Sequence, residues 1–527
     1  MEWTWQLDAN AQGYFQQAMF LEPDGQGNVY GARTFDGTID MNGIVLSGSR
    51  DIVVAKWNSA GEVLWARRVG GMLPPQVQDD DAVTDLAYDS ANDELTVVGT
   101  HSTTLEFDHD TLLGGGVRLY SYVARYASNG ECLWARRGTG DYTYTTKVKI
   151  DGSSTIHVFG GSSTGVLLEG DPSINIPSGG YLSHYSEDGD LLGAELIVSS
   201  GSVHGSTQLA NDAYVIAGNG SGSFLGDPIA SSGSPSTGFL SMTNLVDEVE
   251  WLIPFRSSVG ATVSEPLLLG TDRLVVKGIF YEDLILPTDT LHSLPGTQNA
   301  YIACFNLEGE LLWLTQLASP EWSAAGWGFS VDENGNSYFI GDYKGSVTMG
   351  SVSLSASTSS QGLIAKFDTT GVCRAAWDYG RVRGGAGSLL YTNDGIYFSC
   401  AYDSVCTIGT SVIDPPIAWS GSMFIAKIDS LVGFTGVQSL GEIGGGALHI
   451  YANPTNGLCT VDLPESLRIS NGLVLSVFDN LGQLVQRAPL EFTDIGLRLD
   501  VRAQAKGVYH VELGDGIQRY TGTIVFE

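Results

Sequence analysis

The sequence predicts an all-β protein: a seven-bladed β-propeller closed by an N-terminal strand, followed by a small C-terminal β-sandwich. Three observations predict this class. A unit of about 60 residues recurs seven times. Each unit holds four short strand-like segments with turn residues between them. Further strand-like segments follow a short Gly-rich stretch near the end of the chain.

The third strand of each unit gives the clearest register for the repeat. It is rich in β-branched and aromatic residues, as in IVVAKW (52–57) and LIAKF (363–367). A small residue occupies one column in every copy. These residues are Ala55, Ala124, Ser183, Ser241, Ala303, Ala365 and Ala426. The copies of this strand therefore predict seven blades.

The fourth strand of the unit is repeated almost letter for letter. GEVLWARR (61–68) returns as GECLWARR (130–137). We interpret it as the outer strand of a blade, with a tryptophan that packs between neighbouring blades rather than against a ligand. The tryptophans in this column are Trp65, Trp134, Trp251 and Trp313.

The seventh unit ends without a fourth strand. Its third strand, FIAKI (424–428), is followed by no segment of the LWARR type. At the other end of the chain, EWTWQL (2–7) resembles the fourth strand EWLIPF (250–255). We expect this N-terminal segment to complete the last blade, because a closed ring has no exposed strand edge.

The first unit carries a family resemblance. It reads GNVYGARTFDGTID (27–40), RDIVVAKWNSAG (50–61) and EVLWARRVGG (62–71). These segments resemble the repeats of bacterial seven-bladed propeller proteins, and the resemblance extends over residues 2–437. It implies the fold and no particular activity, because propellers carry many functions.

A second resemblance covers the C-terminal residues. YANPTNG (451–457), VFDNLGQLV (477–485) and GVYHV (507–511) resemble, in this order, the motifs of the C-terminal sorting domain of type IX secretion clients. Ala452 stands where the family has its first proline. The motif residues that we assign are Tyr451, Asn453, Pro454, Gly457, Asp479, Gly482, Gly507 and Tyr509. The predicted domains are a propeller (1–437), a Gly-rich linker (438–448) and a sorting-type β-sandwich (449–527).

The sorting-domain resemblance implies export and a partner. The expected partner is the secretion machinery, and the expected location is secreted or on the outer cell surface. The N-terminal MEWTWQLDANAQ has neither a basic region nor an apolar region of a signal peptide. We therefore expect the export signal to be absent from this chain.

Composition excludes two classes of partner. The chain has 59 acidic and 26 basic residues, a net charge of −33, which disfavours binding to nucleic acid. No apolar run reaches the roughly 18–20 residues that cross a bilayer, so we predict no membrane span.

Among six cysteines, Cys400 and Cys406 bracket an apparent hairpin and could form a disulfide. The other four are predicted to be buried and inert.

Candidate binding residues lie in the longer connections. Three adjacent acids, Asp79, Asp80 and Asp81, are either solvated or bridged by a cation. Tyr142, Tyr144 and Trp322 belong to connections between blades. Antiparallel geometry puts these connections and those between second and third strands on one face of the disc, which we predict to be the binding face.

Three short motifs give no strong site. GSSTG (161–165) fits a nucleophile elbow, but it lies between strands, so Ser163 is interpreted as a turn residue. DENGN (332–336) is interpreted as a hairpin turn that lacks the full calcium-loop pattern. We therefore predict no catalytic residue, no metal site and no cofactor, with a structural calcium ion as the one open possibility.

These patterns favour a secreted or cell-surface, non-enzymatic propeller that binds a glycan or a protein. Two alternatives stay open. A polysaccharide hydrolase or lyase could gather carboxylates from several blades at the channel mouth, which sequence spacing cannot reveal. A purely structural role in a surface assembly is the second alternative.

Overall fold

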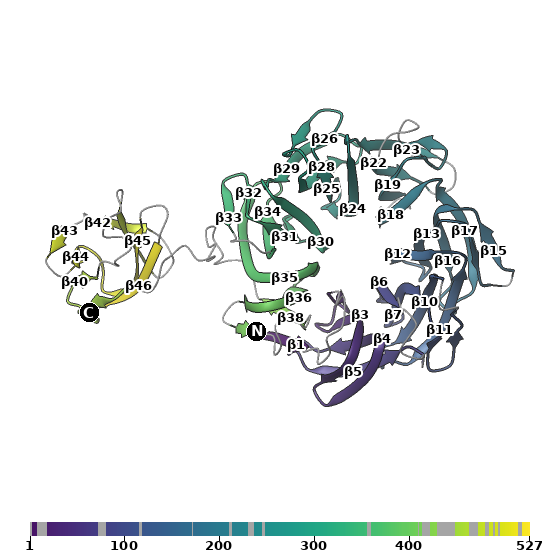
Figure 1. Ribbon diagram of the computed structural model, residues 1–527, viewed down its shortest axis with the longest axis horizontal. Helices are drawn as coiled ribbons and strands as arrows, with labels where there is room; N and C mark the ends of the chain where they lie inside the picture. The colour runs from purple at the N-terminus through teal and green to yellow at the C-terminus, as the bar shows by residue number, and fades with distance from the viewer. Residues whose placement is uncertain are drawn as a thin grey trace. The chain divides into compact units, whose positions relative to one another are not determined.

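The computed structural model describes residues 3–7, 18–71, 81–114, 118–170, 172–209, 213–229, 237–244, 248–355, 360–408, 411–413, 422–428, 448–462, 473–479, 484–488, 491–493, 496–514 and 519–527. All of the regular elements in this part of the chain are β-strands, so the predicted all-β class is confirmed (Figure 1). The chain divides into two compact units, Met1–Ser439 and Leu440–Glu527. Within the described residues, no helix is long and apolar enough to cross a membrane.

The first unit is built from antiparallel sheets arranged around a common centre, as the blades of a β-propeller are (Figure 1). Within the described residues, three of these sheets have four strands, two have six, and one has eight because the long strand β35 joins two groups of strands. The innermost strands are β2 (Phe20–Pro23), β6 (Ala82–Asp89), β12 (Thr143–Ile150), β18 (Gly201–Gln208), β24 (Gly260–Leu269), β30 (Trp322–Val331) and the second half of β35 (Cys373–Thr392). The second strands are β3 (Val29–Met41), β7 (Glu94–His101), β13 (Ile156–Ser162), β19 (Tyr214–Gly220), β25 (Arg273–Tyr281), β31 (Ser337–Lys344) and β36 (Gly395–Ile408).

The third strands carry the buried β-branched and aromatic residues of the repeat. They are β4 (Ile44–Trp57), β10 (Tyr120–Ala127), β16 (Gly179–Tyr185), β22 (Thr237–Thr243), β28 (Gln298–Asn306), β34 (Gln361–Phe367) and β38 (Ser422–Ile428). The outer strands are β5 (Val63–Val69), β11 (Cys132–Thr139), β17 (Leu191–Val198), β23 (Val249–Phe255), β29 (Leu311–Leu317), the first half of β35 and β1 (Trp3–Leu7).

The N-terminal strand lies far along the sequence from its partner. β1 pairs antiparallel with β38, with Trp3 opposite Lys427 and Leu7 opposite Met423. β1 is therefore the edge strand of the sheet that also contains β36 and the second half of β35. One end of the chain thus supplies a strand to a sheet formed near residue 425.

Small hairpins connect second to third strands and reach the preceding sheet. These extra strands are β8 (Leu105–Glu106), β9 (Thr111–Leu112), β14 (Val166–Leu168), β15 (Ile174–Ile176), β20 (Ser223–Phe224), β21 (Asp227–Pro228), β26 (Asp283–Ile285), β27 (Thr290–His292), β32 (Ser346–Met349), β33 (Val352–Ser355) and β37 (Ser411–Ile413). Leu168 of β14 pairs with Gly138 of β11, and Phe224 of β20 pairs with Val198 of β17. Each of these pairings links one sheet to the outer strand of the sheet before it.

The repeated tryptophans lie between neighbouring sheets, as predicted. Trp65 Nε1 donates to the carbonyl oxygen of Ser128 at 2.8 Å, and Trp134 Nε1 donates to that of Glu187 at 2.8 Å. Each acceptor is in the turn between the third and fourth strands of the next sheet. Trp251 and Trp313 make the same bond to Leu307 and Thr369. This contact explains why the LWARR segment is repeated.

A glycine in the same turn makes room for each indole. Gly130 has φ of 84° and Gly189 has φ of 82°, a region that favours glycine. A Cβ atom at Gly189 would lie 2.6 Å from Cδ2 of Trp134, and one at Gly130 would lie 2.7 Å from Cδ2 of Trp65. The repeated G-E pair and the repeated tryptophan are therefore two halves of one contact, which we call the Trp–Gly clasp.

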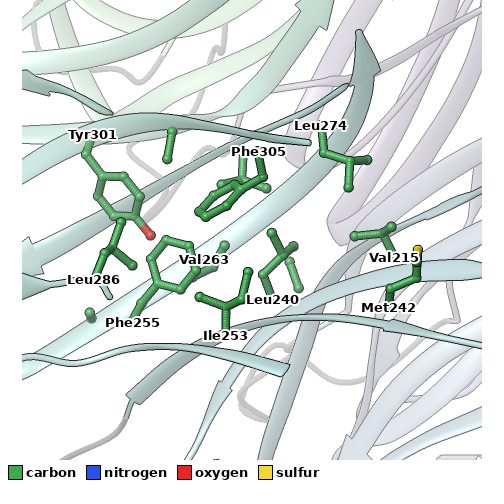
Figure 2. Packing of buried hydrophobic residues seen from close by; sticks show 14 of the residues in the cluster. Val215, Leu240, Met242, Ile253, Phe255, Val263, Leu274, Leu286, Tyr301 and Phe305 are labelled. Atoms are coloured by element: carbon green, nitrogen blue, oxygen red, sulfur yellow. The ribbon is translucent and has the colours of Figure 1, made fainter. Parts of the chain in front are cut away.

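Apolar side chains fill the space between sheets. Figure 2 shows the cluster between the sheet of β18, β19, β22 and β23 and the sheet of β24, β25, β28 and β29. Leu240 and Ile253 from the first sheet face Val263 and Phe305 from the second (Figure 2). Fully burying one such side chain contributes about 1.5–3 kcal/mol. Face-to-face packing of this kind fixes each sheet against the next.

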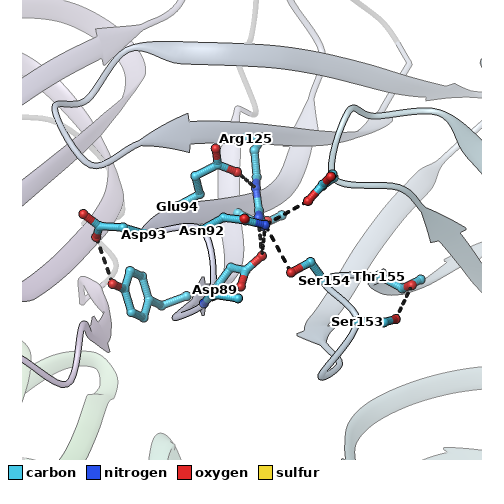
Figure 3. A network of polar contacts seen from close by, with 12 residues as sticks. Asp89, Asn92, Asp93, Glu94, Arg125, Ser153, Ser154 and Thr155 are labelled. Atoms are coloured by element: carbon cyan, nitrogen blue, oxygen red, sulfur yellow. Dashed lines mark hydrogen bonds and ion pairs between the residues drawn. The ribbon is translucent and has the colours of Figure 1, made fainter.

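Ion pairs recur on the face that carries the tight turns. Lys56 Nζ lies 3.1 Å from Asp24, Arg125 Nη2 lies 2.6 Å from Asp89, and Lys427 Nζ lies 2.5 Å from Asp394. In each pair a cation on the third strand meets an acid in the turn that joins the first and second strands. Figure 3 shows the Arg125 example, in which the guanidinium also donates to Glu94 at 2.8 Å.

The predicted disulfide is wrong. Cys400 and Cys406 lie on the single strand β36, not on two arms of a hairpin. Six residues of strand separate their Cα atoms by about 20 Å, whereas a disulfide needs less than about 7 Å. None of the six cysteines forms a disulfide, and all six are buried, as predicted for the other four.

The second unit consists of two four-stranded sheets around its own core. One sheet runs β39 (Ile450–Tyr451), β40 (Leu458–Val461), β44 (Gly496–Asp500) and β43 (Glu491–Thr493). The other runs β42 (Leu484–Ala488), β41 (Val474–Phe478), β45 (Gly507–Gly514) and β46 (Arg519–Phe526). Leu475, Val477, Leu497, Leu499 and Val511 are fully buried between them.

Candidate functional site

The innermost strands of the first unit are irregular at the same depth. β6 shifts register between Val83 and Asp85, and β12 shifts between Thr145 and Lys147. β18 and β24 shift at the equivalent points, next to Gly205 and between Ser264 and Leu267. A bulge bends a strand and re-aims the side chain beside it. These bulges bring charged groups of several sheets together at the centre of the unit.

Four charged side chains form an alternating chain across the centre. Lys147 Nζ lies 3.4 Å from Asp85 Oδ1 and 2.9 Å from Glu265 Oε1. Lys277 Nζ lies 2.9 Å from Glu265 Oε2. The residues come from β6, β12, β24 and β25, so the chain joins three sheets. We call Asp85, Lys147, Glu265 and Lys277 the central charge chain.

Glycine at the bulge of β18 lets this chain form. A Cβ atom at Gly205 would lie 2.6 Å from the backbone nitrogen of Glu265. Glu265 itself has φ of 49°, in the left-handed region that a non-glycine residue seldom adopts. A larger residue at position 205 would push β24 away. Because Gly205 has no side chain, β18 leaves room for Lys147 of β12 to reach Glu265 of β24.

Burial and neighbouring charges act in opposite directions on the pKa values of Lys147, Glu265 and Lys277. Burial opposes the charge on Lys147, but the carboxylates of Asp85 and Glu265 outweigh burial and raise the pKa of that lysine. Burial likewise opposes the charge on Glu265, but Lys147 and Lys277 lower its pKa. For Lys277, burial outweighs the neighbouring carboxylate and lowers the pKa. The acids and bases of the chain thus satisfy one another.

Glu22 has a carboxyl group whose pKa is raised, in contrast to the lowered pKa of Glu265. It lies on β2 and accepts a hydrogen bond from the backbone nitrogen of Tyr88 at 3.3 Å. Burial raises its pKa to about 7; Lys149 lowers the pKa and Asp85 raises it, each by less than burial does. Glu22 can therefore exchange a proton near neutral pH beside the central charge chain.

A cavity opens on the face that carries the tight turns. Its volume is about 410 Å³. It is lined by the turn after β2, the turn after β30 and the turn after β35. The lining residues are Pro23, Gly25, Gly27, Asn28, Val29, Val331, Glu333, Tyr391, Thr392, Asn393, Asp394 and Tyr397. We call it the turn-face cavity. Sequence reasoning missed it, because these turns are short and resemble their copies elsewhere.

The three adjacent acids do not form a described cation site. Asp79 and Asp80 lie outside the described residues. Asp81 is buried, and its carboxylate accepts hydrogen bonds from the backbone nitrogen of Ser102 at 2.9 Å and from Thr103 Oγ1 at 2.7 Å. Its contacts are those of a residue that anchors the end of β7.

The predicted aromatic residues lie at two sheets, with Tyr142 and Tyr144 at β12 and Trp322 on β30. Tyr142 is 62% exposed beside the start of β12. Tyr144 Oη is hydrogen-bonded to Ser202 Oγ at 2.7 Å, which joins β12 to β18. Trp322 lies on β30, opposite Lys344 of β31. A ligand-binding role for these residues and for Asp81 stays a prediction.

Two turn motifs have their expected local structure. Ser163 donates from Oγ to the carbonyl oxygen of Asp141 at 3.1 Å, beside the end of β13. Asp332 accepts from the backbone nitrogens of Asn334 and Asn336 at 3.0 and 2.8 Å, which closes an Asx-type turn. Among the described residues, no group of three or more His, Cys, Asp or Glu side chains could hold a metal ion.

The motif residues of the second unit lie in and around its two sheets. Asn453 links two segments: its Nδ2 donates to the carbonyl oxygen of Thr523 at 2.7 Å, and its Oδ1 accepts from Val525 N at 2.9 Å. Gly457 has φ of 100°, and a Cβ there would lie 2.4 Å from Cγ of Arg502.

The remaining motif residues divide between buried and exposed positions. Tyr509 is buried, and its hydroxyl donates to the carbonyl oxygen of Ala505 at 2.5 Å. Tyr451 is 38% exposed at the edge of the first sheet, and Pro454 is exposed in the segment after it. Asp479 follows β41, Gly507 begins β45, and Gly482 lies outside the described residues.

Residues 449–527 match the protein family described as "Secretion system C-terminal sorting domain". The second unit is a type IX sorting domain. The sorting domain indicates export to the cell surface or the extracellular space, and it implies an interaction with the secretion machinery. The expectation that the chain lacks an export signal is not borne out, because the sorting domain is itself such a signal.

Solved structures similar to this chain include proteins of low sequence identity. A streptogramin B lyase structure is 7% identical, with 81% of this chain and 97% of that chain covered and a TM-score of 0.38. The virginiamycin B lyase from Staphylococcus aureus is 8% identical, with 81% and 100% covered and a TM-score of 0.36. A protein of unknown function from Bacteroides caccae is 10% identical, with 65% and 94% covered and a TM-score of 0.26. No curated protein matches the chain.

Proposed function

We propose that the protein is an exported, non-enzymatic propeller of seven blades, closed by β1, that binds an extracellular glycan or protein. The sorting domain supports export. The pairing of β1 with β38 supports closure by the N-terminal strand. The proposed domains are a propeller over 1–437, a linker over 438–448 and the sorting domain over 449–527.

The central charge chain is the observation that carries the non-enzymatic proposal. Glycoside hydrolysis needs one protonated carboxylic acid and one free carboxylate. Asp85 and Glu265 share Lys147 at 3.4 and 2.9 Å, and Glu265 also meets Lys277. These contacts occupy carboxylate oxygens of both acids, and the two lysines lower the pKa of Glu265. The four residues therefore behave as a structural crosslink between sheets rather than as an acid–base pair.

A binding screen tests this proposal. The full chain is applied to a glycan array and, in parallel, used as bait against extracellular proteins. We expect at least one binder and no release of reducing ends from polysaccharides. Absence of any binder in both screens would remove the binding proposal.

Glu22 favours a second candidate, a polysaccharide hydrolase or lyase. A carboxyl group with a pKa of about 7 suits a general acid, and Asp85 is close enough to raise that pKa. The same polysaccharides are incubated with the wild type and with Glu22→Gln. Release of reducing or unsaturated ends by the wild type, lost in Glu22→Gln, would establish this candidate over the binding protein.

A further inference from the structure

We propose that the turn-face cavity is a binding site for one neutral sugar residue of an extracellular glycan. This inference rests on the proposed binding function and gives it a place and a ligand class. The predicted binding face was the opposite one, which carries the hairpins between second and third strands. Five properties of the turn-face cavity support this ligand class: its size, its fixed walls, its aromatic surface, its polar groups and its charge.

The size suits a small ligand. Its volume of about 410 Å³ falls within the range of roughly 300–1,000 Å³ that small-molecule sites occupy. Pro23, Val29 and Val331 supply apolar walls, and Asn28, Glu333 and Asn393 supply polar groups. Mostly apolar walls with a few polar groups are typical of sites that orient a ligand.

The walls are fixed before any ligand arrives. Asp24 accepts from the backbone nitrogens of Gln26 and Asn28 at 2.8 and 3.0 Å, and its other oxygen accepts from Asn28 Nδ2 at 2.6 Å. On the other side, Asp394 Oδ2 accepts from Lys427 Nζ at 2.5 Å and from Tyr397 Oη at 3.1 Å. Preformed walls reduce the entropy lost on binding.

One aromatic ring is held in place on the wall. Tyr391 stacks on Tyr338 with ring centroids 5.2 Å apart and an interplanar angle of 19°. Tyr391 is partly exposed and lines the cavity, so its ring offers the ligand an apolar surface whose orientation is set by Tyr338. The C–H face of a pyranose ring is apolar, whereas its edge carries hydroxyl groups, and it therefore matches an apolar ring bordered by polar groups.

The polar groups around this ring are exposed to solvent. Glu333 already meets the hydroxyl of Tyr391 and accepts from Asn334 Nδ2 at 3.4 Å, and its two carboxylate oxygens can accept further hydrogen bonds, as the exposed Asn393 amide can. Both side-chain bonds to Asp394 end on Oδ2, so among the described residues Oδ1 of that carboxylate accepts none. Carboxylate oxygens accept from hydroxyl donors, and the Asn393 amide both donates and accepts.

The charge of the cavity walls disfavours anionic ligands. Glu333 and Asp394 are acids on the wall, and the whole chain carries a net charge of −33. An anionic ligand such as a uronic acid, a sulfated sugar or a phosphate would be repelled. A neutral sugar satisfies the acids through its hydroxyl groups without adding like charge, and its ring uses Tyr391.

Calorimetry with the full chain tests the proposal. The probes are neutral oligosaccharides of glucose, galactose and mannose, the uronic acid equivalents, and spermidine as a small cation. We expect binding of at least one neutral oligosaccharide. Asn393→Ala removes the hydrogen bonds of the amide to the ligand, and Glu333→Gln replaces one carboxylate acceptor with an NH2 donor; each is expected to weaken that binding about tenfold. Tyr391→Phe keeps the ring and is expected to weaken binding less than either change.

A matched control separates this site from the rest of the surface. Glu308→Gln removes an exposed acid from a turn on the same face, outside the cavity, and is expected to leave affinity unchanged. Thermal melts verify that each variant is folded. We expect Asn393→Ala, Glu333→Gln and Glu308→Gln to fold, because the substituted residues lie in turns at the surface. A neutral glycan that binds equally well to Asn393→Ala and Glu333→Gln would overturn this inference and leave the proposed binding function intact. Binding of spermidine alone would also overturn it, and no ligand in the wider screens would instead remove the proposed function.

Discussion

The outer and inner strands of the first unit hold neighbouring sheets together in different ways. On the outside, one contact recurs, in which a tryptophan meets a backbone carbonyl and a turn glycine of the next sheet. The four tryptophans are Trp65, Trp134, Trp251 and Trp313. At the centre, the central charge chain occurs once and joins sheets that differ in sequence. The Trp–Gly clasp therefore holds neighbouring sheets together around the unit, whereas the central charge chain joins three particular sheets at its centre.

The largest expected effect is on the Trp–Gly clasp. Trp134→Ala removes a buried indole and its hydrogen bond to Glu187, which costs about 3–5 kcal/mol. Chemical denaturation of the full chain measures the loss. Leu133→Ala, at the exposed neighbouring position, serves as the control and is expected to cost less than about 0.5 kcal/mol. Similar losses for both variants would show that the clasp contributes nothing special.

The next effect is on the central charge chain. Lys147→Met leaves Asp85 and Glu265 without their shared cation, and breaking such a pair costs about 3 kcal/mol. Equilibrium unfolding gives the value, with exposed Lys149→Met as the control. Adding Asp85→Asn to Lys147→Met should recover part of the loss, because Asp85 is the acid that loses its lysine, whereas Glu265 still meets Lys277. No recovery in the double variant would argue against the charge-pair explanation.

A smaller effect should appear as a dependence on pH. The pKa of Glu22 is raised to about 7, so the folded state disfavours its ionised form. Its contribution to stability is complete below the unfolded pKa, near 4.5, and is lost as the pH rises through about 7. Thermal midpoints of wild type and Glu22→Gln, measured from pH 5 to 8, should therefore diverge, with the variant increasingly favoured at higher pH. A constant difference would mean that Glu22 ionises normally.

The smallest expected effect concerns calcium at DENGN. Asp332 Oδ1 already accepts from the backbone of Asn334 and Asn336, and Oδ2 accepts from Tyr338 Oη at 3.1 Å. Lys366 Nζ lies 3.4 Å from the same oxygen. We propose that this turn needs no metal, so adding EDTA should leave the thermal midpoint within about 1 °C. A clear fall, restored by calcium alone, would place an ion in the fold.

The repeat made the outer strands readable from the sequence. One column of tryptophans and one column of turn glycines recur at nearly constant spacing, and a contact that recurs must join equivalent sheets. The sorting domain was readable for a different reason, since its motifs are local and ordered along the chain. Cys400 and Cys406 were misread because a turn was assumed between them, whereas the strand β36 runs straight through both.

The interior could not be read in the same way. Lys147 lies 62 residues from Asp85 and 118 from Glu265. The three occupy the same position of the repeat, two residues after the one that pairs with the glycine of the second strand, but the residue type in this column changes from acid to base, so the column has no recognisable pattern. Their meeting depends on bulges and on the space that Gly205 leaves, neither of which has a sequence signature. The turn-face cavity is hidden for a related reason, because three ordinary turns form it only when their sheets stand side by side.

The sequence by itself determined the strands, their repetition, the tryptophans between sheets and the sorting domain. These depend on short-range spacing, which fixes the face that each side chain presents. The tertiary structure alone decided which charges meet at the centre and which turns enclose a cavity. Those contacts depend on the angle between sheets and on local bulges, and such geometry follows from packing across the whole unit.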